Sequence, residues 1–192
     1  MRVGRALVPL LLVAAFIISC GDPPDKEIQQ AQAAIAAAKS AGADQYATED
    51  YTAAQTALKQ AGDAVDQRDY RLALNHALDA REHALSAAKD AAERKAAARV
   101  DSDKAVARAA AALGEARVRL KSAEAAHASP KVLADARHTI AGVEQAVQKA
   151  RTDREQENYL AALDSVKDVT PRLQAVAREL ESASPAAPHK RH

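Results

Sequence analysis

The chain has 192 residues, of which 51 are alanine, and its 27 basic and 26 acidic residues leave a net charge of +1. Alanine buries little apolar surface, which contributes about 25 cal/mol per Å², so the composition excludes a deep core that encloses an active-site pocket. The chain also lacks the basic excess of proteins that bind nucleic acid, so we expect no nucleic-acid partner. Because alanine is the strongest helix former, the composition predicts an all-α protein with thin helical bundles.

The first twenty residues predict export and lipid attachment. Two arginines precede an uncharged apolar run over 6–18, which is typical of a signal peptide and falls short of the about 20 residues that a membrane span needs. The sequence IISC at 17–20 resembles the lipobox of bacterial lipoproteins. That resemblance implies removal of residues 1–19 and acylation of Cys20, the only cysteine. The alternatives are a discarded signal-peptide cysteine and an unpaired surface thiol.

The residues on either side of the predicted helices indicate a tether and a tail. Residues 20–25 contain glycine and two prolines, which predict a non-helical linker after the lipid anchor. Gly21 rather than aspartate follows the cysteine, which in lipoproteins favours the periplasmic side of the outer membrane. Residues 183–192 are rich in proline and alanine and then basic, so we expect a disordered tail.

A first three-helix unit is predicted over residues 26–99. Its first helix stops at Gly42, which can take a left-handed conformation, and Thr48 is expected to cap the second helix. The third helix opens at Asp69 and Tyr70. Its expected buried face has the i, i+3, i+4, i+7 spacing and comprises Tyr70, Ala73, Leu74, Ala77, Leu78, Ala84, Leu85 and Ala88.

The third helix is expected to continue into the second unit. From Asp69 to His127 only Gly114 interrupts the run of helix-forming residues. A helix of nearly sixty residues is about 90 Å long at 1.5 Å per residue. If this helix breaks, the sequence VDSD at 100–103 is the expected place.

The second three-helix unit, over residues 100–182, is predicted to be a duplicate of the first. The sequence AKSA at 38–41 matches LKSA at 120–123 with an offset of 82, whereas RDYRLALNHALDA matches ENYLAALDSVKDV with an offset of 89. The second copy therefore carries seven extra residues near the end of its middle helix. Seven residues are about two helical turns, which keeps the apolar stripe on one face. The expected boundaries are a start at Ser129 and Pro130 and a kink or restart at Thr170 and Pro171.

Residues 34–91, AIAAAKSAGADQYATEDYTAAQTALKQAGDAVDQRDYRLALNHALDAREHALSAAKDA, resemble a family of alanine-rich helical domains of unknown function in the bacterial envelope. The shared pattern includes Gly42, Tyr46, Tyr51 and Tyr70, while Thr48 stands where the family often has proline. The resemblance implies an envelope protein, commonly a lipoprotein, and brings no catalytic residues.

The histidines suggest two metal sites, and neither is preferred. His76, Asp79 and His83 lie on one side of a helix at the i, i+3, i+7 spacing, so they could bind a metal if a second helix added a ligand. This side is predicted to face away from the apolar stripe, which favours a solvated polar face. The sequences EAAH at 124–127 and DARH at 135–138 are similar to the Glu-x-x-His motif of di-iron bundles but lack its partner glutamates.

We therefore expect a non-enzymatic protein without a cofactor, because no catalytic grouping fits such a fold. Its architecture is predicted to be an elongated antiparallel bundle whose two units share a long helix. The expected function is that of a membrane-anchored periplasmic lipoprotein serving as a structural, spacer or adaptor protein. Candidate partners are the membrane through Cys20, another envelope protein, the cell wall and a second copy. The alternative is a periplasmic metal- or small-ligand-binding protein. The four tyrosines are expected to be packing anchors rather than a binding strip.

Overall fold

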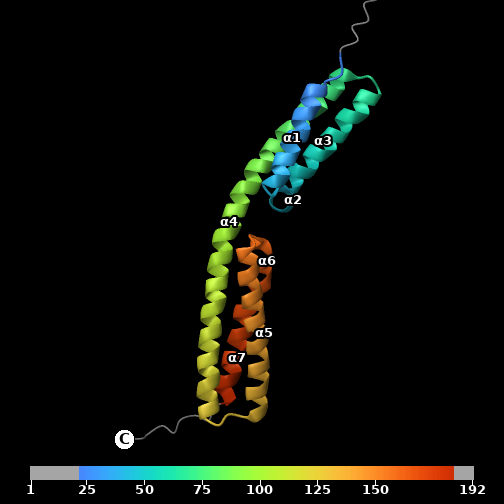
Figure 1. Cartoon of the computed structure of the whole chain (residues 1–192). Helices are drawn as coiled ribbons and strands as arrows, with labels where there is room; N and C mark the ends of the chain where they lie inside the picture. Colours follow the sequence, from blue (N-terminus) through green and yellow to red (C-terminus); the bar gives the residue numbers. More distant parts are fainter. Residues whose placement is uncertain (1–21, 184–192) are drawn as a thin grey trace, which may run out of the picture.

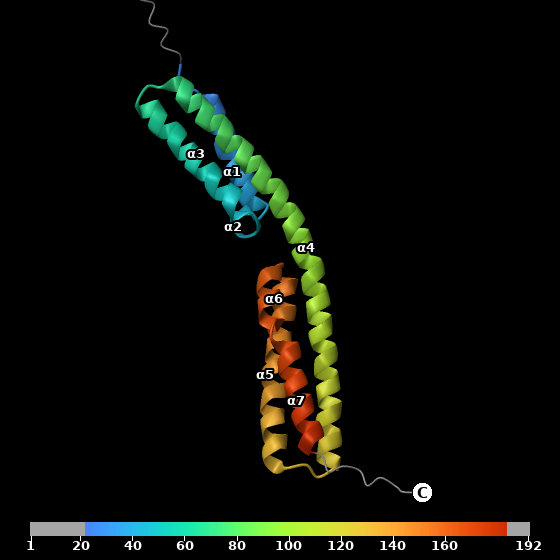
Figure 2. The same ribbon diagram turned by 180° about the vertical axis from the view of Figure 1, so that it is seen from behind.

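The computed structural model describes residues 22–183, in which helices and short connections form two bundles that lie end to end (Figures 1 and 2). No strand occurs in this range, so the predicted all-α class is confirmed. The predicted signal peptide, Cys20 and nearly all of the predicted tail lie outside the described residues. The helices are α1 (Asp25–Ser40), α2 (Ala43–Tyr46), α3 (Thr48–Asp66), α4 (Tyr70–Ala125), α5 (Pro130–Glu155), α6 (Tyr159–Val166) and α7 (Val169–Ala183).

One continuous helix, α4, runs through both bundles. Its 56 residues span about 84 Å at 1.5 Å per residue, and every other helix packs against it. Helices α1 and α3 cover its first half, and α5, α6 and α7 cover its second half (Figure 1). No break occurs at 100–103, where Ser102 is fully buried and its hydroxyl donates to the Arg99 carbonyl oxygen at 2.8 Å.

The buried side of α4 changes its phase between the two bundles. Most of its buried residues follow each other at alternating steps of three and four, the spacing of a supercoiled helix seam. At Ala98, Ser102 and Val106 two steps of four occur in succession, which rotates the seam around the helix. The rotation falls where the partners of α4 change from α1 and α3 to α5, α6 and α7. The buried residues of α4 are Ala73, Ala77, Ala80, Ala84, Ala87, Ala91, Ala98, Ser102, Val106, Ala109, Leu113, Ala116 and Ala123.

Alanines rather than leucines form the buried face of α4 in the first bundle. Ala77 and Ala84 are fully buried as predicted, but Leu78 and Leu85 are 44% and 55% exposed. The prediction that these leucines belong to the core is wrong. The small alanine side chain lets helices α1 and α3 approach the α4 backbone closely, so the seam excludes leucine and leaves it on the outer face of α4.

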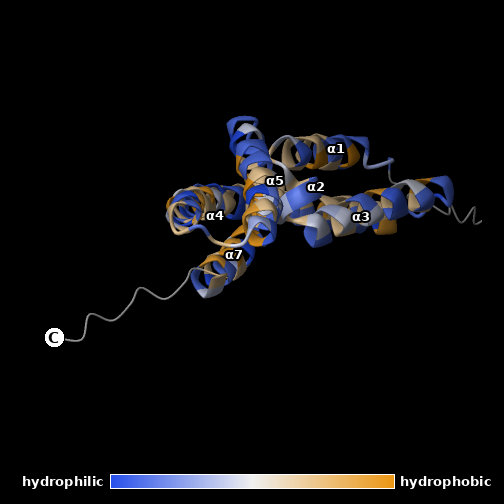
Figure 3. Cartoon of the chain, turned by 90° about the horizontal axis from the view of Figure 1, so that it is seen from below, coloured by the Kyte–Doolittle hydropathy of each residue, from blue (hydrophilic) through white to orange (hydrophobic). Residues whose placement is uncertain are grey.

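The second bundle has a more conventional aliphatic core. Helices α4, α5 and α7 each carry both hydrophobic and hydrophilic residues around their circumference (Figure 3). Tyr159 to Leu180 continue one seam through α6 and α7, despite the short interruption at 167–168 near the predicted restart. The large buried residues of this core are Val106, Leu113, Leu133, Ile140, Val143, Val147, Val166, Val169, Leu173, Val176 and Leu180.

Several helix ends lie where the sequence places them. Gly42 has a φ of 88° after α1, and the one-turn helix α2, which was not predicted, follows it. Asp69 caps α4 as its carboxylate accepts from the Leu72 N–H at 3.0 Å. Thr48 is the first residue of α3 rather than its cap, since Ala47 holds the cap position without a side-chain bond. Ser129 holds the cap position of α5, also without such a bond.

Three helices end in the same turn, with a non-glycine residue in the left-handed conformation. Arg68, His127 and Glu157 have φ values of 59°, 54° and 60°. In each case the next N–H donates to a carbonyl five residues earlier, at 2.9, 3.0 and 2.8 Å, which is the Schellman pattern. Arg68 and Glu157 are 89 residues apart, the offset of the predicted repeat. Helix α3 has 19 residues and α5 has 26, and this difference of seven equals the predicted insertion.

Arg68→Gly should raise the free energy of unfolding by about 0.5 to 1 kcal/mol, because glycine adopts the left-handed conformation without the steric penalty of a Cβ atom. Urea denaturation of the parent and the variant measures the change. Gln67→Gly is the matched control, since Gln67 has an ordinary φ of −82° and glycine there should lower stability. A loss of stability in Arg68→Gly would contradict the assigned turn.

Candidate functional site

The two bundles meet at a junction formed by α2, α4 and the start of α6. The Tyr46 and Tyr159 side chains belong to one buried cluster, although 113 positions separate them in the sequence. The Arg94 guanidinium donates to the Tyr46 carbonyl oxygen at 3.0 Å. The Lys95 ammonium donates to the Glu157 carboxylate at 2.7 Å, which ties α4 to the turn before α6. The tyrosine cluster and the Lys95–Glu157 pair thus connect the two bundles, while the Arg94 hydrogen bond holds α2 against α4 within the first bundle.

The Tyr46 hydroxyl is an unsatisfied polar group inside this junction. The residue is only 8% exposed, and its hydroxyl has no hydrogen-bond partner among the described residues. The N–H groups of Tyr159 and Leu160, at the start of α6, lie near the hydroxyl without closing a hydrogen bond. Burial raises the pKa of Tyr46, an effect that the Lys95 charge partly offsets. The phenol therefore stays neutral at physiological pH.

Charged side chains surround the outer edge of the junction. The Arg154 guanidinium lies 3.2 Å from the Asp103 carboxylate and joins α5 to α4. With Arg99, Glu155 and Glu157, this pair lines an open hollow of about 390 Å³ next to Tyr159. Two arginines face three carboxylates there, so the hollow presents no strong excess of either charge. Its chemistry suits the closure of the interface between the bundles better than the capture of an ion.

The Lys95–Glu157 pair should make the junction sensitive to acid. Its hydrogen bond lowers the pKa of Glu157 and raises that of Lys95. A lowered carboxyl pKa means stabilisation that is present above the ordinary value of about 4.3 and is lost as pH falls through the lowered value. Glu157→Gln should therefore lose less stability between pH 7 and pH 3 than the parent chain.

Urea denaturation across this pH range measures the effect, which should be small because Glu157 is solvent-exposed. Lys95→Met removes the same pair from the other side and should give the same flattened profile. If both variants keep the full acid loss of the parent, the pair does not stabilise the junction.

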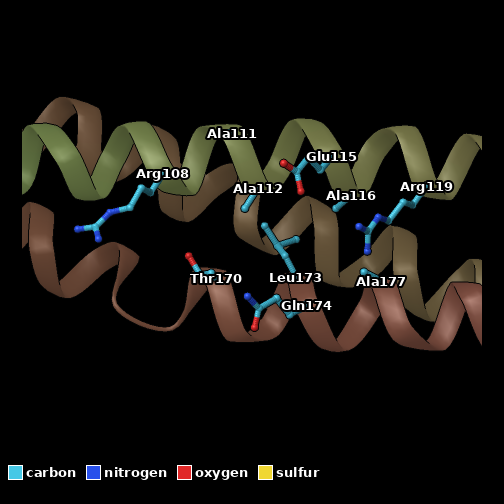
Figure 4. A pocket seen from close by; sticks show the side chains of 10 residues that line it. All are labelled: Arg108, Ala111, Ala112, Glu115, Ala116, Arg119, Thr170, Leu173, Gln174 and Ala177. Carbon is cyan, nitrogen blue, oxygen red and sulfur yellow. The ribbon is translucent and has the colours of Figure 1, made fainter.

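A shallow groove between α4 and α7 is the other hollow of note (Figure 4). It has a volume of about 390 Å³ and a floor of alanines and Leu173. Arg108 and Arg119 lie toward its two ends, with Glu115 between them (Figure 4). Arg119 is already paired with Glu181 of α7 at 3.1 Å. The groove lacks the enclosed apolar lining and converging polar groups of a small-molecule site.

The predicted metal face does not converge on a site. His76 is half-buried and His83 is exposed, and His83 Nδ1 lies 3.5 Å from the Asp50 carboxylate of α3. Asp50 also accepts from the Ser86 hydroxyl at 3.5 Å. The His83 side of α4 thus faces α3 and does not lie opposite the core as predicted. Within residues 22–183, no group of three or more His, Cys, Asp or Glu residues is placed to hold a metal, and Asp79 joins no such group.

The residues of the two Glu-x-x-His sequences have other roles. Glu124 accepts two hydrogen bonds from the Arg137 guanidinium, at 3.0 and 2.7 Å, and so joins α4 to α5. His127 is the left-handed residue of the turn between these helices, and His138 is exposed on α5. The arrangement gives a clamp between two helices and no di-iron site.

The tyrosines pack in the interior. Tyr46, Tyr51 and Tyr159 are buried in one cluster, whereas Tyr70 is half-buried at the start of α4. They supply bulk that the surrounding alanines lack. Sequence reasoning missed that Tyr46 and Tyr159 meet, because nothing local in either segment indicates a contact between the bundles. The only related signal in the sequence was that Tyr159 aligns with Tyr70 in the repeat, which does not point to Tyr46.

No helix within residues 22–183 has the length and apolarity that a membrane span requires. No protein-family model, curated protein or solved structure matches the chain. The resemblance of residues 34–91 to envelope domains therefore stays a prediction.

Proposed function

We propose that this protein is a lipid-anchored, non-enzymatic spacer or adaptor of the bacterial cell envelope, held at the membrane through Cys20. The continuous helix α4 is the observation that carries the proposal. It joins two bundles into a rod, with α1 beginning at one end and α7 ending at the other (Figure 1). A protein attached at the α1 end would hold its α7 end about 80 Å away if it stood upright, at 1.5 Å per residue of α4.

The contacts of the rod support a mechanical rather than a chemical role. Ion pairs join α4 to α5 and α7 on the outside, while the interior is apolar apart from Ser102 and the tyrosine hydroxyls. The hollow at the junction and the groove between α4 and α7 are open and lined mainly by charged side chains or alanines. The described residues thus offer extended helical faces for a protein partner or the cell wall.

The anchor is tested by Cys20→Ala in the full chain. The parent should fractionate with membranes and carry an acylated N-terminal peptide in mass spectrometry, and the variant should lose both properties. Ser19→Ala is the matched control, because it keeps a small residue before the cysteine and should stay anchored. Retention of Cys20→Ala in the membrane fraction, resistant to high salt, would contradict the proposal.

A further inference from the structure

The outer face of α4 in the first bundle carries two leucines that the protein itself does not cover. Leu78 and Leu85 are seven residues apart and therefore lie on the same side of the helix, opposite the buried alanines. Arg81 and Glu82 lie between them, and the four side chains line one shallow hollow. Both charged residues are exposed, and Arg81 also donates to the Gln30 side chain at 3.3 Å.

Read in the opposite direction, these four residues place a leucine opposite a leucine and a positive charge opposite a negative one. The face is therefore complementary to an antiparallel copy of itself. A two-fold axis between positions 81 and 82 places Leu78 opposite the partner's Leu85 and Arg81 opposite the partner's Glu82. Each contact then occurs twice, as an isologous interface requires. Farther from the axis, Arg71 comes opposite the partner's Ala92, one residue before the partner's Glu93. An antiparallel pair of α4 helices thus covers the leucines and pairs opposite charges.

A parallel pair in register satisfies the same leucines but not the charges. It places Glu82 against the partner's Glu82 and, one heptad along, Lys89 against the partner's Lys89. Like charges that face each other across a helix seam disfavour that arrangement. The charge order therefore selects the antiparallel orientation.

We propose that this outer face of α4 binds the same face of a second copy of the chain, antiparallel, with the two-fold axis between Arg81 and Glu82. The inference rests on the adaptor form of the proposed function for its setting, because two antiparallel rods anchored in one membrane lie along it and do not stand upright. The contact between the two α4 helices does not depend on the anchor. One helix face buries less than the about 1,200 Å² of a stable complex. The dimer should therefore be reversible and depend on concentration.

The dimer has a defined shape. The first bundles overlap around the axis, and the second bundles extend in opposite directions. From the axis to Ala125 is about 65 Å in each copy, so the two α4 helices together span about 130 Å at 1.5 Å per residue. A single α4 spans about 84 Å.

Disulfide trapping tests the orientation with the full chain in mild detergent. Leu78→Cys and Leu85→Cys chains with different tags are mixed and oxidised. The antiparallel contact brings position 78 next to position 85 of the partner, while two copies of position 78 remain about 10 Å apart along the axis, beyond disulfide reach. Mixed dimers should therefore exceed same-variant dimers several-fold. Val118→Cys, at an exposed valine of α4 far from the axis, is the control and should trap little dimer.

Charge reversal tests the pairing without relying on cysteine. Arg81→Glu and Glu82→Arg should each reduce the yield of mixed 78–85 dimer several-fold, and the double exchange should restore it, because each copy again meets an opposite charge. A parallel dimer in register would give little mixed 78–85 product in any of these chains, because seven residues keep the two positions about 10 Å apart along the helix. Circular dichroism of each variant checks that the helices remain intact.

The results of these trapping experiments distinguish a failure of the proposed dimer from a failure of the proposed lipid anchor. Predominant same-variant dimers, or equal yields at Val118, would overturn the antiparallel contact. The absence of trapped dimer at any protein concentration would overturn self-association and leave the leucines to another protein. The parent chain, with Cys20 as its only cysteine, is oxidised in parallel. Disulfide dimers of the parent would reveal a free Cys20 thiol and contradict the lipid anchor without bearing on α4.

Discussion

Tyr46→Ala is expected to lower the free energy of unfolding by about 3 to 5 kcal/mol, whereas Tyr46→Phe should leave it unchanged or raise it by about 1 kcal/mol. The alanine variant removes a buried ring from a cluster that otherwise contains mostly small side chains, and it leaves a cavity at the meeting point of the bundles. The phenylalanine variant keeps the ring and removes a hydroxyl whose burial without a partner is costly.

Urea denaturation of the three chains measures both changes. Tyr70→Ala is the matched control, because Tyr70 is only half-buried and lies away from the junction, so its loss should be smaller. Hydrogen exchange adds a local measurement, since Tyr46→Ala should speed amide exchange at the start of α6. A marked loss of stability in Tyr46→Phe would show that the hydroxyl makes a stabilising hydrogen bond, contrary to the structure.

Ala84→Leu is expected to lower the free energy of unfolding by about 1 to 3 kcal/mol, the cost that is typical of an overpacked core. Ala84 is fully buried in the alanine seam of α4, where helices approach closely because the side chains are small. Three added carbon atoms must push the helices apart or take up a strained rotamer. Amide hydrogen exchange should accelerate more in α1 and α3, which pack against this part of α4, than in α5 and α7.

Ala97→Leu serves as the control for this substitution. Ala97 is exposed on the same helix, so leucine there changes helix propensity slightly and meets no neighbouring helix. In urea denaturation, the free energy of unfolding of Ala84→Leu should be lower than that of Ala97→Leu by about 1 kcal/mol or more, which is the cost of overpacking. Equal stability of the two variants would mean that the seam has room for a larger side chain.

Much of this fold was predictable because its signals are local. Gly42 ends α1, Asp69 and Tyr70 open α4, and Pro130 begins α5, each for a reason contained in a few neighbouring residues. The continuity of α4 follows from a run without proline. The anchor at Cys20 stays a prediction, since it lies outside the described residues.

The inward face of α4 was not predictable from hydrophobicity alone. Alanine occurs all round this helix, so the leucines dominate any apolar stripe drawn on it. The structure places Leu78 and Leu85 outside because close packing of backbones selects for small side chains rather than for apolar area. The meeting of Tyr46 with Tyr159 depends on how two bundles stack. Only tertiary structure brings these residues together.

The arrangement of the first and last helices determines how the molecule would respond to tension. Helix α1 begins at one end of the rod and α7 ends at the other, and both lie along α4 (Figures 1 and 2). A pull between the two ends would slide α1 and α7 lengthwise past α4. All their contacts with α4 would then share the force, whereas peeling would break them one turn at a time. Sliding therefore gives a higher barrier to forced unfolding and a slower rate of rupture.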